Sequence, residues 1–173
     1  MIIMLSFLSN SFFQGSGIDY WVDINNDGTL NIKTRTLDHF TSPQIDHTEN
    51  YQIHLSSNRL QKLHQLIRYI DSKAAKDLDD AYKLCDVGSY KLEIKDQQGN
   101  VEKAIYLSEN FPSIIEELLD TERKNQFLAN TELPKNFDIQ KSIETCKAFN
   151  IFLGFISSLL PDSNAKVIKS YYP

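Results

Sequence analysis

Three oxygen-bearing residues, Asp23, Asn25 and Asp27, precede a glycine with the spacing that opens a calcium-binding loop. In such a loop, ligands at positions one, three and five surround the ion, and glycine at position six allows a sharp bend. The twelfth position should supply a carboxylate, but here it is Thr34. The segment also separates two alternating apolar runs, where Asp-Gly is a strong hairpin signal. We therefore predict a hairpin without a structural metal; Asp23, Asn25 and Asp27 are the residues that would ligate calcium if it bound.

Histidine is the second residue type with chemical potential, because its ring titrates near neutral pH and ligates metals. His39 and His47 each follow an aspartate directly. Together with His54, these Asp-His pairs could form a metal or acid–base site of an unrecognised hydrolase. None of them has the spacing of a zinc-protease motif. We expect surface histidines at these positions, and a residue flanking the core at His64.

The sequence shows no pattern typical of nucleophilic or nucleotide chemistry. A catalytic serine or cysteine needs a positioned base and an oxyanion donor, and no Gly-x-Ser-x-Gly motif occurs. Glycine loops that cradle phosphate are also missing from the sequence. Cys85 and Cys146 lack metal-type spacing and are interpreted as reduced thiols, with one disulfide as the alternative. We predict a protein without a cofactor that is not an enzyme.

An acidic run supplies our candidate for partner binding. Between Lys103 and Arg123 every charged side chain is acidic. Apolar residues repeat at helical spacing over 113–120, which leaves the acidic residues of that segment on the opposite face. Acidic groups near a helix start also stabilise the helix dipole, which is a structural reason for them. Complementary charge would raise the association rate and selectivity for a basic partner. The candidate partner-binding residues are Glu109, Glu116, Glu117, Asp120 and Glu122.

Length and composition narrow the class of protein. A chain of 173 residues suits one domain with a real core. Its net charge of -5 repels phosphate and counts against a nucleic-acid partner. The apolar stretch at residues 148–160 is too short to cross a bilayer. The apolar stretch at residues 1–8 lacks the basic residues and the cleavage site of a signal peptide. We expect a cytoplasmic protein with no membrane span, with the periplasm as the alternative location.

The elements that must position these residues are strands and helices in segregated runs. Alternation predicts strands at residues 5–13, 19–24, 29–36, 50–55, 90–94 and 101–107. Helical spacing and caps predict helices at 56–70, 77–84, 113–120 and 138–160, with a polar connection at 122–136. We predict an α+β fold whose mostly antiparallel sheet consists of two hairpins plus an extra strand, with helices on one side. The chain is expected to be one domain over 1–173, with a core at about 5–121 and an apolar C-terminal helical extension at about 137–161.

The order of these signals resembles that of small bacterial α+β domains. The similarity lies in three features: the Asp-Gly hairpin, the run Tyr51-x-Ile-x-Leu-Ser before a leucine-rich helix, and the run Ser89-Tyr-x-Leu-x-Ile before Gly99-Asn and a proline-initiated helix. It covers about residues 18–120. Bacterial immunity proteins, which bind and neutralise a cognate toxin, are often acidic single domains of this kind. The resemblance implies a protein that binds a basic toxin or effector, and it assigns no residue. An extracytoplasmic accessory or ligand-binding domain is the alternative, and a homodimer stays open.

Overall fold

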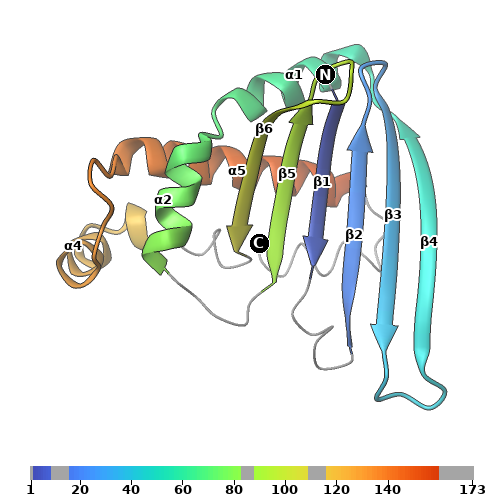
Figure 1. The fold of residues 1–173 in the computed structure, drawn as a ribbon, viewed down its shortest axis with the longest axis horizontal. Coiled ribbons are helices and arrows are strands. Elements are labelled where there is room, and N and C mark those ends of the chain that lie inside the picture. The colour runs from blue at the N-terminus through green and yellow to red at the C-terminus, as the bar shows by residue number, and fades with distance from the viewer. Residues whose placement is uncertain (1, 9–15, 83–87, 109–115, 160–173) are drawn as a thin grey trace. The chain divides into compact units, whose positions relative to one another are not determined.

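The computed structural model describes residues 2–8, 16–82, 88–108 and 116–159. It contains an antiparallel six-stranded sheet and several helices (Figure 1), so the predicted α+β class is confirmed. By internal contacts the chain divides into two compact units. The first comprises residues 1–61 and 86–106 and holds nearly all of the sheet; the second comprises 62–85 and 107–173 and is mainly helical. The single domain expected over 1–173 stays a prediction.

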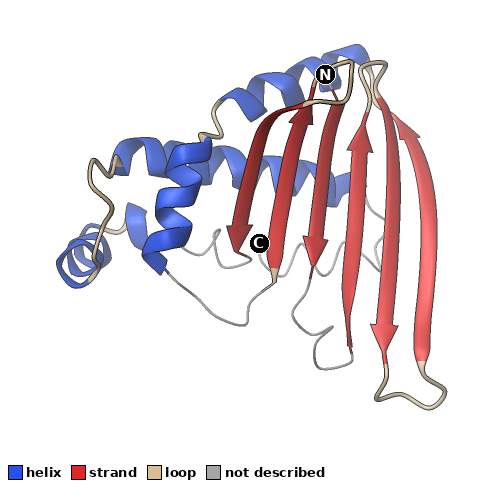
Figure 2. Ribbon diagram, in the orientation of Figure 1, coloured by secondary structure: helices blue, strands red, loops and turns tan. Residues whose placement is uncertain are grey.

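Six strands form the sheet in the order β4-β3-β2-β1-β5-β6 (Figure 2). The predicted β2–β3 and β5–β6 hairpins are both present, and β1 lies between them, antiparallel to both β2 and β5. The bounds of the strands are β1 Ile2–Leu8, β2 Ser16–Ile24, β3 Thr29–Asp38, β4 Ile45–His54, β5 Ser89–Lys95 and β6 Val101–Ser108.

Two strands differ most from their predicted bounds. The first was expected at 5–13 but begins at Ile2 and ends at Leu8; residues 9–13 lie outside the described ranges. The apolar start of the chain is therefore a central strand, which explains its composition. Strand β4 begins at Ile45 rather than at Asn50. The polar first half of β4 lacks the alternating apolar pattern from which strands are predicted. Such a pattern is not required here, because β4 lies at the edge of the sheet, where neither face has to be apolar.

The described helices are α1 Ser57–Arg68, α2 Ser72–Tyr82, α4 Thr121–Asn130 and α5 Ile139–Leu159, and residues 116–119 are also helical. Helix α2 begins earlier than predicted because Asp71 caps it: the Asp71 Oδ1 accepts a hydrogen bond from the Ala74 backbone N–H at 2.8 Å. Asp138 caps α5 as expected, through its Oδ1 and the Lys141 N–H at 3.0 Å.

The polar connection predicted at 122–136 was wrong, because α4 occupies much of it. No side chain of α4 is buried, so the helix lacks the apolar stripe from which helices are normally predicted. Its N-cap is Asp120, whose carboxylate accepts a hydrogen bond from the Arg123 N–H at 2.8 Å. At the other end, the Phe127 carbonyl accepts from the Thr131 N–H at 3.0 Å. Local hydrogen bonds rather than burial define this helix.

Helix α5 supplies much of the buried surface of the second unit. Phe149 and Phe152 have no exposed surface, and their ring centroids are 6.2 Å apart. The Asp71 N–H donates to Thr145 Oγ1 at 3.1 Å, and Asp71 forms an ion pair with Lys141 at 3.0 Å, so the start of α2 is tied to α5. The predicted apolar C-terminal helix is therefore present, and its central aromatic residues are buried. None of the described helices combines the length and hydropathy that a bilayer crossing requires.

In the first unit, burial alternates along residues 20–24 of β2 and 29–34 of β3. In β2 and β3, the side chains of Tyr20, Val22, Leu30 and Ile32 are buried. The intervening positions of the same strands project from the opposite face of the sheet, because successive side chains of a strand alternate between faces. We call that opposite face, over β1 to β5, the outer sheet face.

Candidate functional site

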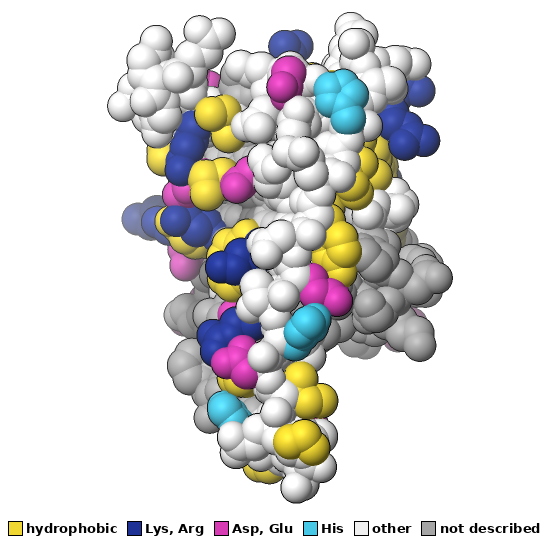
Figure 3. Space-filling view, turned by 90° about the vertical axis from the view of Figure 1, so that its right-hand side faces the viewer, with side chains coloured by type: hydrophobic (Ala, Val, Ile, Leu, Met, Phe, Trp, Pro, Cys, Tyr) yellow, Lys and Arg dark blue, Asp and Glu magenta, His cyan; other side chains and the backbone are white. Residues whose placement is uncertain are grey.

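The β3–β4 hairpin ends in a tip, residues 39–44, that extends past the neighbouring strand. Asp38 pairs with Ile45 across the hairpin, and it also pairs with Ser16, the first residue of β2. The tip residues therefore continue beyond the last paired position of the sheet, as Figures 1 and 3 show. Two large apolar side chains are exposed here: Phe40, with 75% of its surface accessible, and Ile45, with 41%.

Local hydrogen bonds order the backbone of the tip. The Asp38 Oδ1 accepts from the Phe40 N–H at 2.9 Å, and the Thr41 hydroxyl donates to the Pro43 carbonyl at 3.0 Å. Below the tip, the Arg35 Nε and Nη2 donate to the two oxygens of Asp46 at 2.9 and 3.0 Å, a two-pronged ion pair that links β3 to β4. The Arg35 guanidinium lowers the pKa of the Asp46 carboxyl. Phe40 is therefore exposed on a tip whose backbone is held by local hydrogen bonds.

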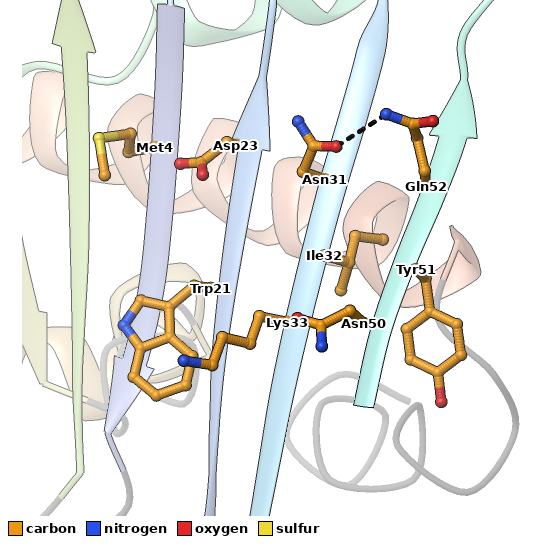
Figure 4. Close-up of a pocket in the computed structure, with 9 residues that line it drawn as sticks. All are labelled: Met4, Trp21, Asp23, Asn31, Ile32, Lys33, Asn50, Tyr51 and Gln52. Carbon is orange, nitrogen blue, oxygen red and sulfur yellow. Dashed lines mark hydrogen bonds between the residues drawn. The ribbon is translucent and has the colours of Figure 1, made fainter. Parts of the chain in front are cut away.

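The outer sheet face carries a second feature, an open hollow of about 670 Å³ over β1 to β4. The strand register places its side chains in two rows that run across the sheet (Figure 4). The first row consists of Gln52, Asn31, Asp23 and Met4, and the second of Asn50, Lys33 and Trp21. We call this surface the outer-face hollow.

The interactions inside the outer-face hollow are few and specific. Gln52 Nε2 donates a hydrogen bond to Asn31 Oδ1 at 3.0 Å. The Lys33 side chain extends across β2, with its Nζ 5.1 Å from the centroid of the Trp21 ring (Figure 4). Burial raises the pKa of the Asp23 carboxyl, against a smaller lowering effect of Lys95. The hollow therefore combines amides, one carboxylate, one ammonium and one indole.

Beside the hollow, β5 carries an alternating charge cluster. Glu93 lies between two lysines, at 2.8 Å from the Lys91 Nζ and 3.5 Å from the Lys95 Nζ. The hydrogen bond from Lys91 lowers the pKa of the Glu93 carboxyl. Lys91 also lies over the ring of Tyr106, 5.7 Å from its centroid. Opposite charges are thus paired on the outer sheet face rather than segregated.

The structure gives the predicted acidic residues different surroundings. Glu116 and Glu122 are exposed, and Glu117 is partly buried beside Arg123 in a shallow hollow that α4 lines. Asp120 is occupied as the cap of α4. Leu118 is buried as expected, but Leu119, predicted on the same apolar face, is 54% exposed because the helix ends there. Glu109 lies outside the described residues.

The Asp-His pairs are used for local structure. Asp38 accepts a hydrogen bond from the backbone of the tip, Asp46 binds Arg35, and His47 Nε2 lies 3.2 Å from Glu49 Oε1. His54 is placed at the other end of β4, opposite Thr29. Burial lowers the pKa of His64, which lies partly buried on α1 as expected for a residue flanking the core. Across the described ranges, His, Cys, Asp and Glu side chains form no group of three or more that could hold a metal ion.

The predicted hairpin turn between β2 and β3 is confirmed. The Asn25 carbonyl accepts from the Gly28 N–H at 3.0 Å, and the Asp27 Oδ1 accepts from the Thr29 N–H at 2.8 Å. Gly28 has a φ of 86°, and a Cβ there would lie 2.6 Å from the Leu55 carbonyl oxygen. Only glycine fits this position. Asp23 belongs to strand β2 and to the outer-face hollow.

The described cysteine, Cys146, is a free cysteine that is buried in α5. Burial raises the pKa of its thiol to about 12, so the thiolate, which is the reactive form, is scarce at neutral pH. Cys85, the other candidate for a disulfide, lies outside the described residues.

Comparison with protein-family models, with curated proteins and with solved structures finds no match. Sequence reasoning missed both Phe40 and Trp21 as surface features. A phenylalanine inside the polar segment at 38–44 is a signal that could have found the first. Trp21 lies in an alternating run typical of a strand, so the local sequence does not distinguish it from an ordinary strand residue.

Proposed function

We propose that this protein is a non-catalytic binding module of the immunity type. In this proposal it neutralises a partner protein by inserting the β3–β4 hairpin tip into a cleft of that partner. The observation that carries the proposal is the exposure of Phe40, 75%, on a tip whose backbone is ordered by local hydrogen bonds. The partner class that the sequence resemblance implies is a basic bacterial toxin or effector.

An exposed aromatic on an ordered turn suits the role of an interface anchor. Aromatic residues that fill pockets dominate the energy of many protein interfaces. Burying a phenylalanine side chain contributes about 1.5–3 kcal/mol. A tip that is ordered before binding loses less conformational entropy on association than a loop that must be ordered. Phe40 and Ile45 therefore offer binding energy that the fold itself leaves unused.

The projection of the tip favours an inhibitory contact. Residues 39–44 lie beyond the paired end of β2, so strand β2 itself, within the part of the chain that the structure describes, does not block their entry into a concave surface. Enzyme active sites are the usual concave surfaces of a protein. A hairpin that fills such a cleft blocks access of the substrate, and no catalysis by the inhibitor is needed.

The acidic residues near α4 are a second proposed contact. Glu116 and Glu122 are exposed, and a partner that carries basic groups would associate faster with a surface of opposite charge. Asp120 is not a suitable anchor for this purpose, because its carboxylate already caps α4. This part of the proposal therefore depends on Glu116 and Glu122.

Site-specific crosslinking in the native host tests the proposal. A photoreactive amino acid replaces Phe40 in one strain and Gln98, on the exposed β5–β6 turn, in a matched control strain. We expect one protein to be crosslinked at position 40 and not at position 98, and we expect the purified wild-type protein to inhibit its activity at a one-to-one ratio. A partner crosslinked equally at both positions, or one whose activity is unaffected by the complex, would contradict the proposal.

A further inference from the structure

The geometry of the outer sheet face points to a binding site that is separate from the hairpin tip. We propose that the outer-face hollow binds an uncharged carbohydrate, with a sugar ring against Trp21 and its hydroxyl groups on Asp23, Asn31 and Gln52. The site does not depend on the proposed protein partner, because it uses different residues of the sheet.

The first row of the hollow has the hydrogen-bonding capacity that sugar hydroxyls require. A hydroxyl both donates and accepts, so it is best matched by a surface with both functions. Gln52 donates to Asn31 Oδ1, which fixes both amides and leaves the Asn31 NH₂ group as a donor and the Gln52 carbonyl oxygen as an acceptor. Asp23 adds a carboxylate that receives no hydrogen bond from the described residues and can accept from two adjacent hydroxyls. Donors and acceptors thus alternate along one row.

The second row supplies the apolar contact. Pyranose rings have faces of C–H groups, and an indole is a flat apolar surface with a polar edge. Trp21 is partly exposed in the hollow, and its neighbour across the strand pair is Lys33. The Lys33 ammonium lies over the ring, 5.1 Å from its centroid. The proposed sugar takes the place of this ammonium on the indole, and the displaced ammonium then donates to one of its hydroxyls.

The charges of the hollow select against ionic ligands. Among the residues that line it, Asp23 is the one carboxylate and Lys33 the one ammonium. The nearby Lys95 ammonium, which contacts Met4, is paired with Glu93 at 3.5 Å, so it adds no unbalanced charge. A site for phosphate or nucleic acid would need an excess of cations, and the chain as a whole carries a net charge of -5. An uncharged ligand meets neither repulsion nor the desolvation of an unpaired ion.

The dimensions of the hollow fit one or two sugar rings. Its volume of about 670 Å³ lies within the range of roughly 300–1,000 Å³ that is usual for small-ligand sites. From Gln52 to Asp23 the first row crosses two strand spacings, about 10 Å. Because the hollow is open to solvent, we expect a dissociation constant on the order of a millimolar.

Intrinsic fluorescence provides a direct test, because Trp21 is the only tryptophan of the chain. The full chain is titrated with neutral oligosaccharides (maltotriose, cellotriose and N-acetylchitotriose) and, as a charged control, with a heparin disaccharide. Saturation-transfer NMR with the same compounds detects binding that leaves the emission unchanged. We expect at least one neutral trisaccharide to change the Trp21 emission saturably at millimolar concentration, with no response to the charged control.

Matched variants locate the site. Gln52→Ala and Asp23→Asn should each weaken binding of that trisaccharide at least fivefold, whereas Gln98→Ala, the same deletion on an exposed turn, should leave it unchanged. The proposal is overturned if none of the neutral compounds binds by either method, if only the charged compound binds, or if the two hollow variants bind as well as Gln98→Ala.

Discussion

The two turns at the ends of strand β3 differ in what their side chains contribute. At one end, the turn between β2 and β3 satisfies its own polar groups and places Gly28 against the Leu55 carbonyl, where the Leu55 N–H also donates to the Gly28 carbonyl at 2.8 Å. At the other end, the β3–β4 tip is equally ordered but leaves Phe40 exposed. Side chains of the first turn are explained by the fold, whereas Phe40 is not.

The difference between the two turns distinguishes residues that are needed for folding from residues that are available for binding. A residue whose removal strains the fold needs no further reason to be present. A large apolar side chain that is ordered and exposed gains nothing from folding, and such exposed surface often marks an interaction site. The contrast predicts that substitutions at the buried or strained positions will lower stability, while substitution of Phe40 will not.

The largest effect is expected for a buried phenylalanine. Phe152→Ala should lower the free energy of unfolding by about 3–5 kcal/mol, because it leaves a cavity at a fully buried site. Phe40→Ala, the same substitution at an exposed site, should change it by less than about 0.5 kcal/mol. Urea unfolding of both variants measures the difference. Equal losses would show that Phe40 belongs to the core and would remove the contrast between the two turns.

The next largest effect concerns the glycines with positive φ. Gly28→Ala should lower the free energy of unfolding by about 2–4 kcal/mol, because it adds a steric clash with the Leu55 carbonyl to the backbone strain. Gly99 has nearly the same φ, 87°, but nothing within 4 Å of an added Cβ, so Gly99→Ala should cost only about 1 kcal/mol. Thermal and urea unfolding check this ranking. Equal costs would mean that the packing of the β2–β3 turn is not what requires glycine.

A smaller loss of stability is expected at the turn before α4. Like the β2–β3 turn, it contains an aspartate whose side chain is used by a backbone hydrogen bond of the fold. Asp120→Ala removes the N-cap and should destabilise α4 by about 0.5–2 kcal/mol. Amide hydrogen exchange of residues 123–126 measures this locally. The double change Glu116→Gln and Glu122→Gln keeps the cap and removes only the smaller dipole contribution of Glu122, so it should lower protection less than Asp120→Ala does. If the double variant loses as much protection as Asp120→Ala, the acidic residues are part of the helix support and not available for a basic partner.

The parts of the fold that were predicted correctly have local causes. The β2–β3 hairpin depends on Asp-Gly between alternating strands, and α1 on leucines at helical spacing, so a short window of sequence contains the reason. Helix α4 was missed because it buries no side chain and depends on local hydrogen bonds at its two ends. The predicted range of strand β4 was too short because an edge strand does not need an apolar pattern.

The outer-face hollow could not be predicted from the sequence, because its residues come from different strands and become neighbours only through the pairing register of the sheet. Asp23 was considered as a calcium ligand, but its neighbours in the structure are Asn31 and Met4, on two other strands. Glu116, Glu117 and Asp120 were assigned to one face, yet the cap role of Asp120 depends on a helix that was not predicted. Phe40 becomes notable only when its exposure and the order of its turn are known together.

Comparison of partner binding and stability in Phe40→Ala is the most direct test of the central claim. The dissociation constant of the crosslinked partner is measured by calorimetry for the wild-type protein and for this variant, alongside the melting temperature of each. We expect affinity to fall at least tenfold, about 1.4 kcal/mol, with the melting temperature unchanged. An unchanged dissociation constant in a folded Phe40→Ala protein would contradict the assignment of the hairpin tip as the anchor of the interface.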